Sequence, residues 1–233
     1  MSTIFPKWTN SLPTMGAGSA VGGLATVVAV VWYFFTPAYW NVGYMPAQPA
    51  GGFNHQLHAG KLGMDCRYCH TKVEESAEAN IPDVASCYGC HAEGRLKLLA
   101  TSESHKNKTA FVRTAYANDE PIEWSRVHKV PDYVRNFPHN AHVNAGVSCY
   151  SCHGNIARMA VVYQAESLSM SWCLDCHRNP EPNLVGKDMV YRLFEVEDRM
   201  NSESKAAIRA SEGKKFYEDR SIAAPENCGA CHY

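Results

Sequence analysis

Five copies of the pattern C-x-x-C-H contain all ten cysteines of this 233-residue chain. The pattern is typical of covalent attachment of c-type haem, because two thiols three residues apart can reach the two vinyl groups of one porphyrin. The histidine that follows then lies close enough to bind the iron. We predict five covalently bound haem c groups, tethered by Cys66/Cys69, Cys87/Cys90, Cys149/Cys152, Cys173/Cys176 and Cys228/Cys231, with His70, His91, His153, His177 and His232 as proximal ligands.

Zinc knuckles and a disulfide framework are the other common uses of paired cysteines. A zinc site does not require a histidine after every second cysteine, yet all five pairs here have one. No cysteine falls outside the pattern, so none is left over for a disulfide. Haem attachment takes place outside the cytoplasm, so the cysteine usage indicates a periplasmic-type compartment.

Length and charge set two further limits. The length suits one or two domains, and five macrocycles would supply much of the apolar interior. The polypeptide can therefore be compact with little regular structure, and we predict a mainly α-helical and irregular fold. The formal net charge of −1 gives no reason to expect a nucleic-acid partner.

Near the N-terminus, Met15–Phe35 is a run of 21 residues without a charged side chain. A helix needs about 20 such residues to cross a bilayer. A cleaved signal peptide and a buried core helix are the alternatives, but the apolar region of a signal peptide is shorter, at about 7–15 residues. Aromatic residues at Trp32–Phe35, with Tyr39 and Trp40 beyond them, are typical of a membrane interface. We predict a cytoplasmic N-terminus (1–13), a single-pass anchor in the inner membrane (14–40), a linker (41–52) and a periplasmic haem-binding part.

The haem-binding part contains an internal duplication. Phe53–His58 reads F-x-H-x-x-H ahead of the first two tethers, and Phe137–His142 repeats that order ahead of the third and fourth. The two copies are offset by 84 residues for both histidines, 83 for the first tether and 86 for the second. Such near-constancy is typical of a repeat. We predict class III-like di-haem modules at 53–136 and 137–200, followed by a C-terminal helix and the fifth haem at 201–233.

Six of the eleven histidines lie outside the tethers and are candidates for the second axial position of each iron. The two histidines of each F-x-H-x-x-H copy are three residues apart, on one face of a helical turn, so each pair can serve two adjacent irons. His105 lies in the polar stretch SESHKNKT and is expected to be solvated. The predicted distal ligands are His55, His58, His128, His139 and His142.

Methionine is the competing distal ligand, and it would raise the reduction potential relative to histidine. Met159 and Met170 both lie between tethers, and simple packing is the alternative role for either. Met170, three residues before Cys173, is kept as a candidate. There are enough histidines and methionines outside the tethers to fill the second axial position of every iron. The sequence therefore favours electron transfer, and no catalytic site is expected in the chain itself.

Three longer phrases resemble a known family: GFNHQLHAGKLGMDCRYCH, PIEWSRVHKVPDYVRNFPHNAHVNAGVSCYSCH and LSMSWCLDCHRNP. They are similar to the pentahaem cytochrome c subunit of bacterial alternative complex III, and the resemblance covers nearly the whole chain. The F-x-H-x-x-H module also resembles class III multihaem cytochromes. By that similarity His55 would cap the haem on Cys66/Cys69, and His139 the haem on Cys149/Cys152. His58 and His142 would serve other haems, and Met170 belongs to the family pattern whereas His105 does not.

The resemblance implies a quinol-oxidising membrane complex. Its other members would be an iron–sulfur and molybdopterin-like subunit, quinone-site membrane subunits and a monohaem cytochrome c. This chain would pass electrons to a periplasmic carrier or a terminal oxidase. The alternative is a stand-alone, membrane-anchored multihaem quinol dehydrogenase that feeds periplasmic reductases. A catalytic pentahaem nitrite or sulfite reductase would need an open haem, and the lysine variant C-x-x-C-K of such nitrite enzymes does not occur in the sequence.

Overall fold

A computed structural model describes residues 5–39, 52–97, 102–124, 126–128, 130, 134, 137–202 and 206–232. The chain divides into two compact units, Met1–Asn41 and Val42–Tyr233. Nearly all of the predicted linker at 41–52 lies outside the described residues. The helical elements, in chain order, are η1 (Lys7–Ser11), α1 (Leu12–Tyr39), η3 (Gln56–Lys61), α2 (Cys66–Cys69), α3 (Val84–His91), α5 (Glu103–Lys108), α6 (Ala110–Asn118), α7 (His139–Ala145), α8 (Tyr150–His153), η4 (Ile156–Arg158), α9 (Met170–Arg178), η5 (Glu181–Asn183), α10 (Leu193–Asn201), α11 (Ala206–Asp219) and η7 (Cys228–Ala230).

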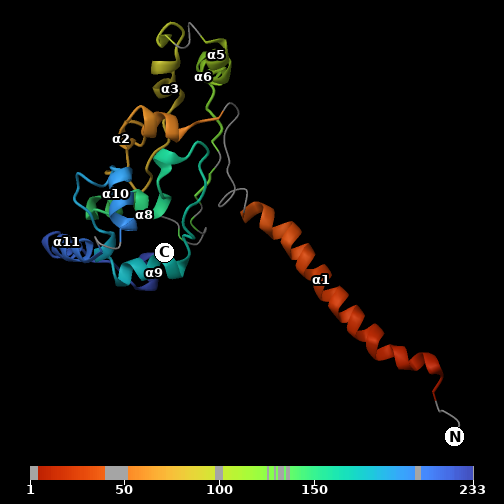
Figure 1. Ribbon diagram of the computed structural model, residues 1–233. Helices are drawn as coiled ribbons and strands as arrows, with labels where there is room; N and C mark the ends of the chain where they lie inside the picture. Colours follow the sequence, from red (N-terminus) through yellow and green to blue (C-terminus); the bar gives the residue numbers. More distant parts are fainter. Residues whose placement is uncertain are drawn as a thin grey trace. The chain divides into compact units, whose positions relative to one another are not determined.

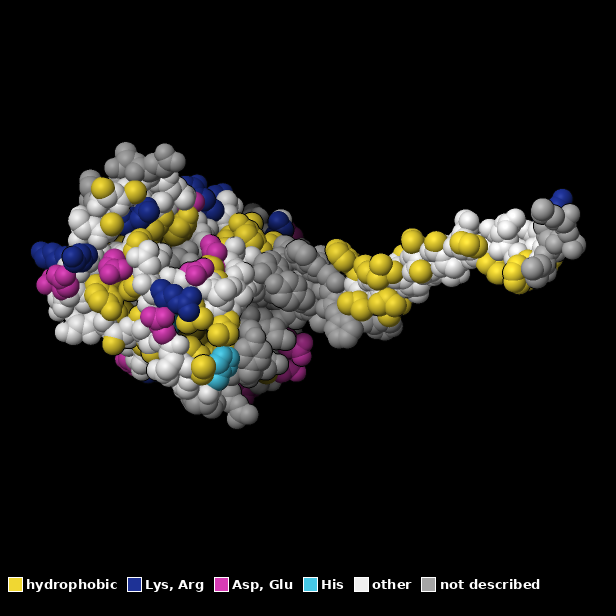
Figure 2. All heavy atoms as spheres, turned by 90° about the horizontal axis from the view of Figure 1, so that it is seen from below, with side chains coloured by type: hydrophobic (Ala, Val, Ile, Leu, Met, Phe, Trp, Pro, Cys, Tyr) yellow, Lys and Arg dark blue, Asp and Glu magenta, His cyan; other side chains and the backbone are white. Residues whose placement is uncertain are grey.

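The N-terminal unit consists of η1 and the 28-residue helix α1. At 1.5 Å per residue α1 is about 42 Å long, which exceeds the roughly 30 Å of a bilayer core. Among the described residues it is the one helix long and apolar enough to cross a membrane, and none of its most apolar stretch, which lies before residue 34, is buried inside the protein. A buried core helix is therefore the wrong interpretation. The side chains that Figure 2 colours on α1 are mostly hydrophobic, whereas charged side chains are spread over the C-terminal unit.

Part of the predicted aromatic belt can be checked in α1. The Trp32 and Tyr33 side chains are exposed, as expected for residues at a membrane interface. The side chains of Phe34, Phe35 and Tyr39, and the whole of Trp40, lie outside the described residues.

The C-terminal unit is built from short helices joined by irregular segments, and no strand occurs in its described part. One isolated antiparallel bridge joins Val147 to Leu184. The predicted mainly α-helical and irregular fold is confirmed. Figure 1 shows α3, α2, α8 and α9 following one another from the top of this unit to its bottom.

Side-chain caps explain why helices this short form at fixed places. Asp65 accepts a hydrogen bond from the Arg67 amide at the start of α2, and Asp83 accepts one from Ser86 at the start of α3. Ser169 does the same at the start of α9. Each cap satisfies an amide that would otherwise have no helical partner, which stabilises a helix start by about 1 kcal/mol. Three of the cysteine pairs thus lie on helices with fixed beginnings.

One buried hydrophobic cluster of this unit consists of valine side chains. It joins the two sequence repeats, because it takes one residue from the first copy and one from α7 of the second. The remaining members come from the segment that leads into α10 and from α10 itself. The buried members are Val73, Val143, Val185, Val190 and Val196.

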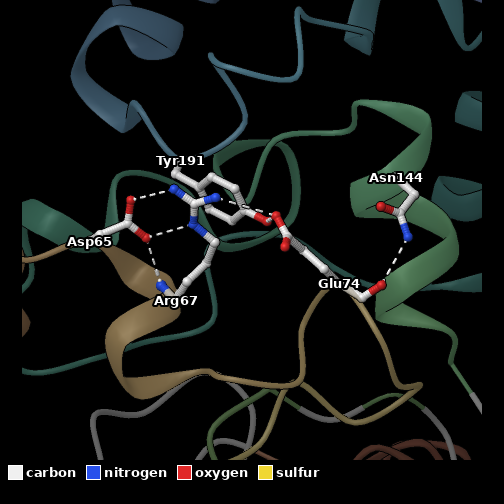
Figure 3. A network of polar contacts seen from close by, with 5 residues as sticks. All are labelled: Asp65, Arg67, Glu74, Asn144 and Tyr191. Atoms are coloured by element: carbon white, nitrogen blue, oxygen red, sulfur yellow. Dashed lines mark hydrogen bonds and ion pairs between the residues drawn. The ribbon is translucent and has the colours of Figure 1, made fainter.

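A polar network links the first repeat to the second (Figure 3). Arg67 donates two hydrogen bonds to the Asp65 carboxylate, both 2.9 Å long, and its guanidinium lies 4.4 Å from the centre of the Tyr191 ring. The Tyr191 hydroxyl donates to Glu74 at 2.7 Å, and the Asn144 amide of α7 donates to the Glu74 backbone carbonyl at 2.9 Å. The hydrogen bonds from Arg67 hold the pKa of Asp65 below its ordinary value. The first repeat is therefore fixed against α7 and the segment before α10.

Candidate functional site

The first four C-x-x-C-H units lie on or at α2, α3, α8 and α9, and the fifth begins on η7. Residues three apart on a helical turn share one face, so the two thiols of each pair project together. None of the ten cysteines forms a disulfide. Within the described part of the chain, no three His, Cys, Asp or Glu side chains converge on a point that could hold a metal ion. The arrangement therefore does not fit zinc knuckles or a disulfide framework.

At one end of the C-terminal unit, the second cysteine pair lies beside the first. Burial raises the pKa of the Cys69 thiol, and the nearby Cys66 and Cys90 thiols raise it further. The pKa of the Cys87 thiol is raised in the same way, by burial and then by the Cys69 thiol. The first pair therefore has the second pair as a neighbour.

The first pair is also next to the third, across 83 residues of sequence. The Cys66 and Cys149 thiols are close neighbours, and their interaction lowers the pKa of Cys66 and raises that of Cys149. The two copies of the repeat therefore meet at their first tethers.

The third, fourth and fifth pairs continue the row. Burial raises the pKa of the Cys152 thiol to about 12, with smaller contributions from Cys176 and Cys173. Cys173 in turn has Cys231 of the fifth pair as a neighbour. In space the pairs thus run second, first, third, fourth, fifth, which agrees with the order of α3, α2, α8 and α9 in Figure 1.

Each F-x-H-x-x-H segment folds into the same arrangement of three rings. In the first copy the Phe53 ring meets His55 edge-on at 4.7 Å and stacks on His58 at 4.6 Å. In the second copy the corresponding distances are 5.0 Å from Phe137 to His139 and 4.4 Å to His142. The phenylalanine of the motif is therefore the platform that orients both histidines.

Three histidine pairs have the separation expected for two ligands of one iron. Two imidazoles that bind one metal from opposite sides, through bonds of about 2 Å, hold their ring centres about 6 Å apart. The ring centres of His139 and the tether histidine His153 are 6.5 Å apart. His58–His91 and His142–His177 are both 6.1 Å apart and occupy corresponding positions in the two copies.

The fourth pair in this part of the unit is His55 with His70. Burial, with smaller contributions from the neighbouring His70, His58 and His128, lowers the pKa of His55 to about 4. His55 is therefore neutral at physiological pH, which is the form of imidazole that binds a metal.

Backbone carbonyls fix the orientation of five of these rings. A carbonyl only accepts a hydrogen bond, so the ring Nδ1 must donate, and the Nε2 lone pair is left for a metal. The distances from Nδ1 to the carbonyl oxygen range from 2.6 to 2.9 Å. The bonds run from His58 to Asn54, from His70 to Asn80, from His139 to Ala77, from His142 to Pro138 and from His177 to Pro225.

His128 has a different environment from the paired histidines. Its ring centre is 4.2 Å from that of His153, which is direct ring contact and leaves no room for an iron between them. Its Nε2 is buried without a hydrogen-bond partner, and burial lowers its pKa to about 4. The role of His128 as a distal ligand stays a prediction.

His105 is the residue that sequence reasoning misjudged. Its ring is half-buried, its Nε2 is buried without a hydrogen-bond partner, and its centre lies 5.9 Å from that of His91. The polar stretch around His105 forms a helix, α5, because Ser102 caps its start and accepts a hydrogen bond from the His105 amide. A serine three residues before the histidine was the available signal.

The two methionine candidates have different surroundings. Met159 is buried at 5% exposed, and its backbone carbonyl accepts a hydrogen bond from the Gln56 amide. Met170 is the first residue of α9 and is 58% exposed. Met159 is thus held in the polypeptide interior, whereas the Met170 side chain is accessible. The ligand role of Met170 stays a prediction.

Paired thiols on single helical turns, and opposed imidazoles with free Nε2 atoms, fit covalently attached haem. A profile of the family described as "Cytochrome c7 and related cytochrome c" matches residues 135–233, which include the second repeat and the third to fifth tethers. The matched region is therefore similar to multihaem cytochromes c. Covalently bound haem c is the cofactor that the paired cysteines of such a cytochrome hold.

One similar protein is the menaquinone reductase multihaem cytochrome c subunit of Nitratidesulfovibrio vulgaris (strain Hildenborough). It is 26% identical over 184 residues, which cover 70% of this chain and 82% of the relative. The similarity therefore extends beyond the matched family region and includes most of both chains.

Arg220 supports α7, the helix that carries His139 and His142. Its Nη1 donates to the Ala145 carbonyl at 2.7 Å and to the Val185 carbonyl at 3.1 Å. Gly146 ends α7 with a φ of +94°, and a Cβ atom there would collide with the same guanidinium. The cation thus sits at the negative end of the helix dipole.

We expect Arg220→Ala to destabilise the haem-loaded protein by about 2–3 kcal/mol, because two carbonyls lose a charged donor. The measurement is denaturant unfolding of the full chain. Arg192→Ala is the matched control, because its 3.4 Å ion pair with Glu195 is exposed and such pairs contribute about 0–1 kcal/mol. Equal losses for the two variants would contradict the proposed support of α7.

Proposed function

We propose that this chain is a membrane-anchored pentahaem cytochrome c that relays electrons within a quinol-oxidising complex. The observation that carries the proposal is the continuous row of five cysteine pairs, in which each pair has another as its neighbour. Haem bound in such a row supplies one-electron transfer from one macrocycle to the next. The polypeptide holds the haems in this order and fills both axial positions of each iron with side chains.

The ligand assignment follows the ring pairs. His55, His58, His139 and His142 would complete the first, second, third and fourth haems, opposite the histidines of their tethers. Met170 and His128 are the two alternative candidates for the fifth haem, on Cys228/Cys231. With both axial positions filled by side chains, no iron offers a site to a small substrate, so the chain carries no catalytic site of its own.

The partners are proposed from two similarities. Three sequence phrases resemble the pentahaem subunit of alternative complex III, and the relative described above is named as a subunit of a menaquinone reductase. Both point to a quinone-linked membrane complex. We assign alternative complex III, with an iron–sulfur and molybdopterin-like subunit, quinone-site membrane subunits and a monohaem cytochrome c as partners. A periplasmic carrier or a terminal oxidase would then accept the electrons.

The proposed location is the inner membrane, with α1 as the single anchor and the haem-binding unit on the periplasmic side. The length of α1 and its exposed apolar side chains support the anchor. Haem attachment outside the cytoplasm supports the orientation.

Purification from membranes in a mild detergent tests this function. We expect the chain to be recovered with the other subunits, and quinol added to that complex to reduce its haems. The isolated chain should hold five haems per polypeptide, remain low-spin and oxidise quinol poorly. A stand-alone quinol dehydrogenase predicts the opposite, and full quinol activity in the isolated chain would rule out the relay role.

A further inference from the structure

The tether histidine of the second haem, His91, faces two other histidines at nearly the same distance. The His58 ring centre is 6.1 Å away with 56° between the ring planes, and the His105 ring centre is 5.9 Å away with 27° between the planes. An iron that already binds His91 and the four porphyrin nitrogens has one position left. The two histidines therefore compete for a single place.

His58 corresponds to His142 in the second repeat, which shares its phenylalanine platform and its Nδ1 bond to a backbone carbonyl. Among the described residues, His142 is the one histidine ring outside the tethers found opposite His177. His105 lies on α5, which follows the second tether of the first copy and precedes the second F-x-H-x-x-H segment. The first copy therefore offers two candidates for the distal ligand of its second haem, His58 and His105.

The His105 side chain is prepared for a metal bond. Its Nε2 is buried and has no hydrogen-bond partner, and leaving a buried polar atom unpaired costs about 1–3 kcal/mol. Binding to an iron would remove that cost. The free nitrogen and the 5.9 Å ring separation are independent observations, and both favour the same role.

The surrounding chain holds α5 against the end of α3. Arg113 donates to the Lys106 carbonyl of α5 at 2.6 Å and to the His91 carbonyl at 3.5 Å. The Tyr88 and Tyr116 rings stack at 3.7 Å and 5°, which joins α3 to α6. One guanidinium and one ring stack therefore set the distance between His105 and His91.

We propose that His105 is an alternative sixth ligand of the haem on Cys87/Cys90, which exchanges with His58 on the iron bound by His91. This haem stands at the end of the tether row, and its Cys90 is exposed. An iron in that position would meet small molecules from solvent whenever its distal ligand left. With two histidines in reach the iron stays closed. The proposal rests on haem attachment at this tether, and it does not depend on which partner complex the chain joins.

Spin state and carbon monoxide binding of the full chain in detergent test the exchange. We expect His142→Ala to open one haem per chain, which becomes high-spin when oxidised and binds carbon monoxide when reduced. His58→Ala should open none, because His105 takes the position. The double variant His58→Ala/His105→Ala should again open one haem. An open haem in His58→Ala, equal to that in His142→Ala, would overturn the proposal.

A second measurement leaves the F-x-H-x-x-H segment intact. The EPR signal of a low-spin haem depends on the angle between its two imidazole planes, so pairs at 56° and 27° give separable signals. We expect His105→Ala to weaken the near-parallel signal, to which the His139–His153 pair at 13° also contributes, and to keep every haem low-spin. An EPR spectrum identical to that of the unaltered protein would overturn the proposal. The mass of the haem-bearing peptide around Cys87 checks attachment separately, and an unmodified peptide would refute the haem itself.

Discussion

Replacing Cys149 and Cys152 with alanine is expected to divide the electron path into two halves. The third tether stands in the middle of the row, between the first tether at Cys66 and the fourth at Cys176. We expect the chain to lose one haem and keep four. When quinol reduces the purified complex, two of those four haems should be reduced quickly, and the two beyond the gap should be reduced slower by orders of magnitude.

The matched control for this variant is Cys228→Ala/Cys231→Ala, which removes the fifth haem, at one end of the row. Its four remaining haems stay contiguous, so they should behave as one group rather than splitting into two. Stopped-flow absorbance of the haems measures whether their reduction occurs in one phase or in two. Reduction of all four haems at the unaltered rate in the Cys149→Ala/Cys152→Ala protein would show that the row is not the path.

Loss of a central cofactor can also unfold a protein. His153→Met avoids this difficulty, because it keeps both thioether bonds and changes one ligand. Methionine ligation raises a haem potential relative to histidine, here by on the order of 0.1 V. A redox titration should show one haem displaced to higher potential, and transfer across the middle of the row should slow.

Exchanging residues 1–41 for a cleavable export signal is expected to release the protein from the membrane. The unit Val42–Tyr233 has its own valine cluster and all five tethers, so its haem absorbance should be unchanged. Fractionation of cells by centrifugation measures the effect, and we expect nearly complete transfer to the soluble periplasmic fraction in cells that lack the proposed partners.

An unrelated transmembrane helix in place of α1 provides the control for that experiment. It should return the protein to the membrane fraction without altering its spectrum. If the protein without residues 1–41 stays in washed membranes of such cells, another part of the chain binds lipid and α1 is not the single anchor.

Features determined by neighbouring residues were the ones the sequence could predict. The thiols of a C-x-x-C-H unit share a helical turn, and the three rings of F-x-H-x-x-H lie within six residues of one another. The capping residues Asp65, Asp83 and Ser169 also act over two or three positions. Such contacts depend little on the rest of the fold, so spacing alone describes them.

The order of the tethers depends on contacts that are distant in the sequence. Cys66 lies beside Cys149, and the second tether lies outside the first rather than between the first and the third. No local pattern encodes this arrangement, because it follows from the valine cluster and the network around Glu74. The exposure of His105 was misjudged for the same reason, since the residues that surround its ring come partly from α3.

The hydrogen bond from His139 to the Ala77 carbonyl has a consequence for how this duplicated chain can change. A ligand of the second copy takes its orientation from a loop of the first, and Asn144 is fixed to the same region by Glu74. The two copies are therefore not structurally independent, and one copy cannot be deleted, exchanged or added without affecting the other. Adding another tandem copy to the row of haems would require that copy to find, in the copy before it, a loop equivalent to the one that contains Ala77. A tether such as the fifth, added at the far end, makes no such demand.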